Sequence, residues 1–109
     1  MPRYGLVYKV KKELIDEYEK AHSNIWPEMN SAIRDAGFRN YSIFAMDDGT
    51  MFAYLEHDNL KKGFEQISKT EVSKRWQKYM ERFFEKSNSK SEGPEYIYLK
   101  EVYHIDWFI

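Results

Sequence analysis

The 109-residue sequence contains no cysteine and only 3 prolines and 5 glycines, and none of its apolar runs approaches the ~20 residues of a membrane span. Without cysteine, disulfide bonds, thiolate nucleophiles and cysteine-ligated zinc are excluded. The chain also has no excess of charge of one sign, because its 17 Lys and Arg are balanced by 18 Asp and Glu. A nucleic-acid site needs a basic surface. We therefore expect no nucleic-acid or membrane partner.

The first residues, MPRYGLVYKVKKEL, lack the apolar core and cleavage site of a signal peptide. Together with the absence of cysteine, this predicts a cytoplasmic protein. The length fits one domain over residues 1–109. A composition of 42% hydrophobic and 32% charged residues is typical of a globular chain rather than a disordered one.

Aromatic residues are abundant, at 17% of the chain, with 9 Tyr, 7 Phe and 3 Trp. A core of this size needs only some of them. The surplus indicates an aromatic-lined pocket, a subunit interface, or both, because both favour rigid amphipathic rings.

The hydrophobic spacing changes along the chain and predicts the order of the elements. Alternation over residues 3–10 predicts a strand, and helical spacing begins at Lys12. Pro27 disfavours helical dihedral angles at Trp26, so we expect a break near residues 24–26 and a second helix starting at Pro27. Gly37 is a natural end for that helix.

The second half of the chain begins with a predicted hairpin, NYSIFAM and MFAYLEH joined by DDGT. Residues 59–70 predict a short helix and residues 71–86 a longer one with Thr70 as N-cap. Its apolar stripe contains Val72, Trp76, Tyr79, Met80 and Phe83. Residues 87–95 predict an exposed loop, and the chain from Tyr96 onward predicts a fourth, long strand.

The resulting order, β-α-α-β-β-α-α-β, predicts an α+β ferredoxin-like sandwich whose helices cover one face of a four-stranded antiparallel sheet. The strands carry apolar residues on both faces, and an exposed apolar sheet face is a liability for a monomer. We therefore expect a homodimer that packs sheet against sheet.

Tyr18 and His22 form the first candidate constellation. They lie four residues apart on a predicted helix, so their side chains share one face, and Trp26 follows one turn later. One interpretation makes Tyr18 a core residue and His22 a solvated helix end. The other makes this corner a pocket with a titratable imidazole.

The remaining candidates have simple structural interpretations. Tyr41 at a strand end and Trp76 on an apolar stripe both suit packing, and Arg75 and Lys78 suit a solvated face. His22, His57 and His104 are dispersed and lack a metal-ligand spacing such as H-E-x-x-H. We expect no metal and no cofactor, and no role for His57 or His104 at strand ends.

Three segments of the chain resemble signature segments of the L-rhamnose mutarotases and occur in the same order. They are YEKAHSNIWPE (18–28), NYSI (40–43) and RWQKYM (75–80). The length, the element order and Glu-Val-Tyr at 101–103 match as well, so the resemblance covers essentially the whole chain. It implies a dimeric α+β barrel that interconverts the α and β anomers of L-rhamnose without a cofactor.

By this resemblance, His22 corresponds to the proton donor, while Tyr18, Tyr41, Trp76 and position 77 contact the sugar. Position 77 is a departure, because the family often has a second Trp where this chain has Gln77. An amide trades apolar area for hydrogen bonds, so another 6-deoxy-L-hexose such as L-fucose becomes an alternative substrate.

Histidine suits this chemistry because ring opening and closing need a group that gives and takes a proton near pH 7. Two other classes of function remain open for the same fold. One is a cofactor-free or haem-linked monooxygenase, and the other is a non-catalytic sugar-binding domain. Accelerated anomer exchange, measured by NMR, would distinguish a mutarotase from both of these alternatives.

Overall fold

The computed structural model describes residues 1–84 and 95–108. The strands are β1 (Arg3–Lys9), β2 (Arg39–Ala45), β3 (Thr50–Glu56) and β4 (Ile97–Leu99). The α-helices are α1 (Ile15–Ser23), α2 (Pro27–Asp35), α3 (Leu60–Ser68) and α4 (Glu71–Met80). Short 3₁₀ helices occupy η1 (Lys12–Leu14), η2 (Glu81–Phe83) and η3 (Ile105–Phe108).

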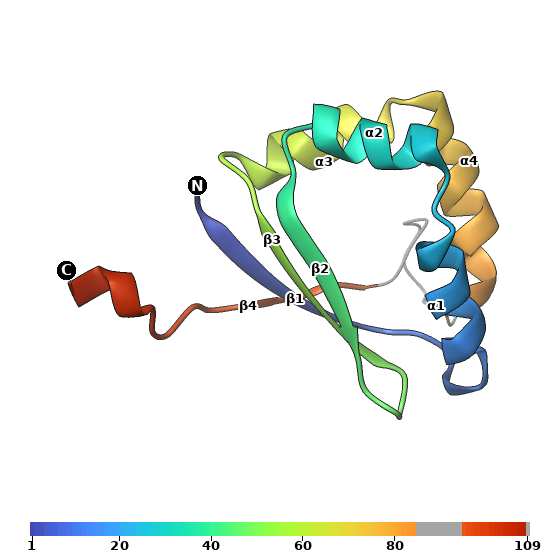
Figure 1. The fold of residues 1–109 in the computed structure, drawn as a ribbon, viewed down its shortest axis with the longest axis horizontal. Coiled ribbons are helices and arrows are strands. Elements are labelled where there is room, and N and C mark those ends of the chain that lie inside the picture. The colour runs from blue at the N-terminus through green and yellow to red at the C-terminus, as the bar shows by residue number, and fades with distance from the viewer. Residues whose placement is uncertain (85–94, 109) are drawn as a thin grey trace.

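The four strands form one antiparallel sheet in the order β2-β3-β1-β4, and the four α-helices form an arc over one face of it (Figure 1). Alternate residues of β1 and β3 point toward the helices and are buried, as period-2 side-chain alternation requires. They are Leu6 and Tyr8 on β1 and Met51, Ala53 and Leu55 on β3. The predicted ferredoxin-like α+β sandwich is confirmed.

The junction between α1 and α2 follows from Pro27. Helix α1 ends at Ser23, and Trp26 adopts an extended conformation (φ −59°, ψ 129°) directly before Pro27, the first residue of α2. The pyrrolidine ring disfavours helical angles at the residue before it but fits a first helical position. The predicted break is confirmed, and it turns the chain between two helices that cover the same face of the sheet.

Side-chain caps set the starts of the last two α-helices. The Asn59 side chain accepts the backbone N–H of Lys62 at 3.2 Å, and the Thr70 hydroxyl accepts that of Ser73 at 3.2 Å, so the predicted Thr70 cap is confirmed. Along α4 the predicted stripe is buried at Trp76, but Tyr79 lies on the exposed side. Among the helices of residues 1–84 and 95–108, none is long and apolar enough to cross a membrane.

The prediction of a long last strand was wrong. Only Ile97–Leu99 pairs, with Gly5–Val7 of β1, and the chain then leaves the sheet and extends away from the body of the molecule (Figure 1). Beyond Leu99 the backbone no longer pairs with β1, and the Arg3 side chain contacts Glu101 at 2.9 Å, so period-2 alternation alone does not form a ladder. The predicted loop at 87–95 falls, except for Glu95, outside the described residues.

The sheet face away from the helices has an apolar row at its centre. The registers place Phe44, Phe52, Val7 and Ile97 side by side in one row across all four strands. Phe44 is 61% exposed, Phe52 42% and Ile97 62%. Such a row across a whole sheet is more extensive than the isolated apolar residues of an ordinary surface.

Candidate active site

A cavity of about 730 Å³ lies between the sheet and the helices. The structure brings every predicted site residue to its wall: Tyr18, His22, Tyr41, Trp76 and Gln77. They come from α1, β2 and α4, so the fold joins three segments that are distant in sequence.

His22 lies in the last turn of α1, and its Nδ1 atom is 3.0 Å from the backbone carbonyl oxygen of Tyr18. A carbonyl oxygen only accepts hydrogen bonds, so Nδ1 carries the proton and donates it. In the neutral ring Nε2 then holds a lone pair, and among the described residues it has no hydrogen-bond partner. Burial lowers the pKa of His22, and the bond to Tyr18 opposes this only in part. The neutral imidazole therefore dominates at pH 7.

Aromatic rings surround the imidazole on two sides. The Tyr18 ring lies 4.4 Å from that of His22, centroid to centroid, and the Trp76 ring lies 5.7 Å away, edge to face. Trp26 packs edge to face against Trp76 at 5.1 Å and stacks on Tyr79 at 5.6 Å. Because Trp26 is not part of the cavity wall, it supports Trp76 from behind.

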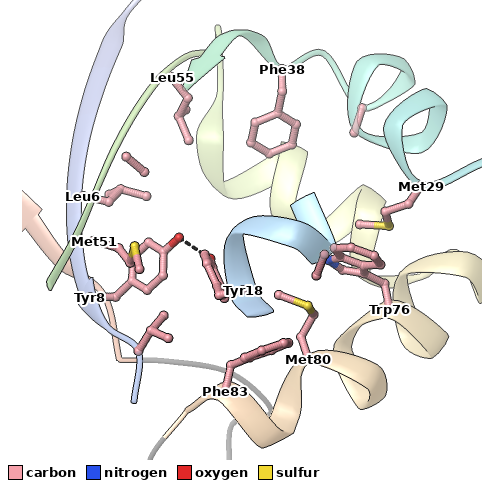
Figure 2. Packing of buried hydrophobic residues seen from close by; sticks show 14 of the residues in the cluster. Leu6, Tyr8, Tyr18, Met29, Phe38, Met51, Leu55, Trp76, Met80 and Phe83 are labelled. Atoms are coloured by element: carbon pink, nitrogen blue, oxygen red, sulfur yellow. Dashed lines mark hydrogen bonds between the residues drawn. The ribbon is translucent and has the colours of Figure 1, made fainter. Parts of the chain in front are cut away.

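Tyr18 satisfies both interpretations of its position, because it belongs to the core and also lines the cavity. It is 6% exposed, and its hydroxyl lies 2.6 Å from the hydroxyl of Tyr8 on β1 (Figure 2). Burial is the main cause that raises the pKa of each phenol. Both are therefore neutral at physiological pH and act as hydrogen-bonding groups.

A β-bulge orients Tyr41. Between the pairs Arg39–Glu56 and Ser42–Tyr54, β2 has two residues opposite the single Leu55 of β3, and Asn40 takes a positive φ of 49°. Bulges redirect side chains, and Asn tolerates this conformation better than most residues. As a whole residue Tyr41 is 39% exposed, while its side chain contributes to the cavity wall and burial of the phenol group raises its pKa.

Helix α4 supplies Trp76 and Gln77 from adjacent positions. Trp76 is 6% exposed and so belongs to the core as well as to the cavity wall, whereas Gln77 is half-buried. Within the described part of the chain, the Gln77 amide makes no hydrogen bond. Its donors and acceptor are free for a polar ligand.

Two tyrosines of the cavity wall were missed in the sequence. Tyr8 and Tyr96 line the cavity with Tyr18 and Tyr41, and the rings of Tyr8 and Tyr96 lie 5.3 Å apart. The alternation over residues 3–10 predicted only that Tyr8 lies in a strand. It did not indicate that its hydroxyl meets that of Tyr18, since β1 and α1 are related only by tertiary packing.

His57 has a structural role that the sequence did not indicate. His57 is 8% exposed, its Nε2 lies 2.6 Å from the Ala36 carbonyl oxygen, and its Nδ1 accepts the Asn59 backbone N–H at 2.8 Å. It connects the end of α2 to the start of α3, away from the cavity. His104 makes an exposed contact of 3.2 Å with Asp106. The described residues contain no cluster of three or more potential metal ligands.

The fold and site define a ferredoxin-like α+β protein with one histidine in an aromatic cavity. Known proteins are similar to this chain in sequence over nearly its whole length. The family model of L-rhamnose mutarotase matches residues 3–105. The chain is 38% identical over 107 residues to the L-rhamnose mutarotases of Lactiplantibacillus plantarum and Bacillus subtilis, covering 97% of this chain and 100% of each relative. The chain belongs to the L-rhamnose mutarotase family, as the sequence motifs predicted.

Solved structures agree on the fold. An L-rhamnose mutarotase from Formosa agariphila superposes with a TM-score of 0.81 at 24% identity, covering 96% of this chain and 99% of that one. A dimeric ferredoxin-like protein from an uncultured marine organism superposes with a TM-score of 0.59 at 12% identity, covering 94% of this chain and 95% of that one. At these identities the likeness supports the architecture alone.

Proposed function

We propose that this protein accelerates the interconversion of the α and β anomers of L-rhamnose, with His22 as the group that exchanges protons with the sugar. The main support for this proposal is the hydrogen bonding of the two ring nitrogens of His22. Its Nδ1 is engaged by the Tyr18 carbonyl, which leaves Nε2 for a ligand in a cavity bounded by Tyr18, Tyr41, Trp76 and Gln77.

Anomer exchange breaks the bond between C1 and the ring oxygen, lets C1 rotate and closes the ring on its other face. The anomeric hydroxyl loses a proton while the ring oxygen gains one, and closure reverses both transfers. A neutral His22 takes the anomeric proton at Nε2 and gives it to the ring oxygen as the ring opens, and both transfers reverse on closure. A positioned acid–base group contributes roughly 10²–10⁴-fold, which suffices because the reaction also proceeds slowly in water.

Substrate contacts follow from the chemistry of the wall. A 6-deoxyhexose has a methyl group and apolar C–H faces, which pack on rings such as that of Trp76. Its hydroxyls need donors and acceptors, which Tyr18, Tyr41 and Gln77 supply. The phenols have raised pKa values, so they stay protonated as hydrogen-bonding groups and leave proton transfer to His22.

The test is a panel of sugars, L-rhamnose, L-fucose and L-mannose, scored for anomer exchange by saturation-transfer NMR with and without the protein. We expect acceleration to be greatest for L-rhamnose. Greater acceleration of L-fucose would instead support L-fucose as the substrate, the alternative that Gln77 raises. Sugar binding without any acceleration would support the non-catalytic alternative, and turnover of a quinol would support the oxygenase.

We also propose that the protein is a cytoplasmic homodimer whose subunits meet through the row of Phe44, Phe52, Val7 and Ile97. These side chains are exposed or partly exposed in one chain, and a solved protein of the same fold is described as dimeric. Burying such a face is favourable at roughly 25 cal/mol per Å² of apolar surface.

Light scattering after gel filtration tests the dimer. We expect the wild-type protein to elute with twice the mass of one chain and Phe52→Glu to elute as a monomer. The matched control is Lys61→Glu on the exposed side of α3, which should remain a dimer. A monomeric wild-type protein would contradict the proposal.

A further inference from the structure

Tyr8 lines the cavity but has no part in the reaction described above. It lies on β1, is 4% exposed and points at Tyr18 across the space between sheet and helices (Figure 2). The two hydroxyl oxygens are 2.6 Å apart, near the short end of the range for O–H···O bonds. Apart from this bond, the Tyr8 hydroxyl has no hydrogen-bond partner among the described residues.

We propose that Tyr8 is a positioning residue, whose hydroxyl fixes the Tyr18 hydroxyl in the orientation in which it meets the sugar. This inference rests on the proposed function and deepens it. A phenol hydroxyl rotates about its C–O bond and has one donor and two acceptor sites. With Tyr8 occupying one of these sites, Tyr18 presents the remaining sites to the cavity in a fixed direction.

Because both phenols are neutral, the hydrogen bond between Tyr8 and Tyr18 contains one proton, which one oxygen donates and the other accepts. Burial raises the pKa of Tyr8 and of Tyr18, so two protons serve two oxygens and only one proton occupies the shared bond. A sugar hydroxyl bound to Tyr18 would extend the pair to a chain of three hydroxyls. Successive hydrogen bonds in such a chain strengthen one another, whether Tyr8 donates to Tyr18 or accepts from it.

Packing holds Tyr8 in place without using its hydroxyl. Its ring lies edge to face against Phe84 at 6.3 Å and Tyr96 at 5.3 Å, and both neighbours also line the cavity. Phenylalanine would keep these ring contacts. Tyr8→Phe therefore removes the hydrogen bond and leaves the shape of the core unchanged.

The test is a double-mutant cycle of Tyr8→Phe and Tyr18→Phe, read as kcat/KM for L-rhamnose anomer exchange. We expect Tyr8→Phe to lower kcat/KM roughly 3- to 10-fold, the effect of one neutral hydrogen bond, mainly through KM. In the Tyr18→Phe background the same change should cost less than twofold. Equal losses in both backgrounds, or no loss in the single variant, would overturn the proposal.

Tyr79→Phe is the matched control, since it removes an exposed hydroxyl outside the cavity wall and should leave kcat/KM unchanged. If the wild-type protein binds L-rhamnose without accelerating exchange, the proposed reaction fails, and the same cycle is then read in the Kd for L-rhamnose. Wild-type protein labelled with ¹³Cζ-tyrosine provides a test that needs no stable variant. L-rhamnose should shift the Tyr8 and Tyr18 resonances together, and a shift of Tyr18 alone would overturn the proposal.

Discussion

The Nδ1 atom of His22 donates a hydrogen bond to the carbonyl oxygen of Tyr18, 3.0 Å away and one turn earlier in α1. One backbone group thus selects the tautomer of the ring and leaves Nε2 for a ligand. The same helical turn places the Tyr18 ring beside the imidazole. The spacing of four residues therefore sets both the position and the protonation of the proposed acid–base group.

The first prediction concerns pH. Burial lowers the pKa of His22 from its ordinary value near 6.5, so kcat/KM for anomer exchange should rise with pH below that value and be level from about pH 7. Between the lowered and the ordinary pKa the unfolded chain binds more protons than the folded one. His22 therefore stabilises the fold above about pH 6.5, and this contribution is lost as the pH falls.

NMR exchange rates from pH 5 to pH 8, corrected for the buffer-catalysed rate, test the activity profile. Chemical-shift titration of the His22 ring locates the pKa independently. A kcat/KM that increases toward low pH would contradict a reaction in which the neutral imidazole acts first.

The second prediction concerns Trp76, which is core and cavity wall at once. Trp76→Ala removes a side chain that is 6% exposed and packs against His22 and Trp26. It should lower the free energy of unfolding by about 3–5 kcal/mol and also weaken sugar binding. Trp76→Phe, the milder control, should keep most of the stability and lose affinity for L-rhamnose. Urea unfolding and calorimetric titration measure the two effects separately, and unchanged affinity in the Phe variant would show that the indole does not contact the sugar.

The third prediction separates folding from catalysis at His57. His57→Ala loses hydrogen bonds to the Ala36 carbonyl and the Asn59 N–H at a buried site. We expect a loss of about 2–4 kcal/mol in urea unfolding, with kcat/KM unchanged below the unfolding midpoint, because His57 does not line the cavity. Gly37→Ala should also destabilise the protein, since Gly37 has φ +94° and a Cβ atom there would lie 2.9 Å from the His57 ring. A His57→Ala variant that folds stably but is inactive would mean that His57 acts on the site.

The sequence predicted the local features well because they depend on neighbouring residues. Pro27 set the break between α1 and α2, Thr70 capped α4, and four-residue spacing joined Tyr18 to His22. Features that depend on distant segments were missed. The hydroxyl contact of Tyr8 and the hydrogen bonds of His57 arise only when separate elements pack, and the end of the last strand at Leu99 depends on where its backbone stops pairing with β1.

The positions of the site residues could likewise be predicted only in part from the sequence. The motifs that resemble the family pointed to His22, Tyr18, Tyr41, Trp76 and Gln77, and the fold brings all five to one cavity. Their roles toward a sugar stay predictions. Composition and spacing alone left Tyr41 and Trp76 as packing residues, because a bulge that turns Tyr41 inward has no clear sequence signal beyond Asn40.

The most direct test of the account compares His22→Ala with wild-type protein in saturation-transfer NMR of L-rhamnose at pH 7. Lys20→Ala, a neighbouring change on α1 at an exposed position outside the cavity wall, is the matched control. We expect His22→Ala to lose about 10²-fold or more of the catalysed exchange while its unfolding free energy stays within about 1 kcal/mol of wild type, and Lys20→Ala to exchange normally. A folded His22→Ala variant that exchanges the anomers as fast as wild type would contradict the account.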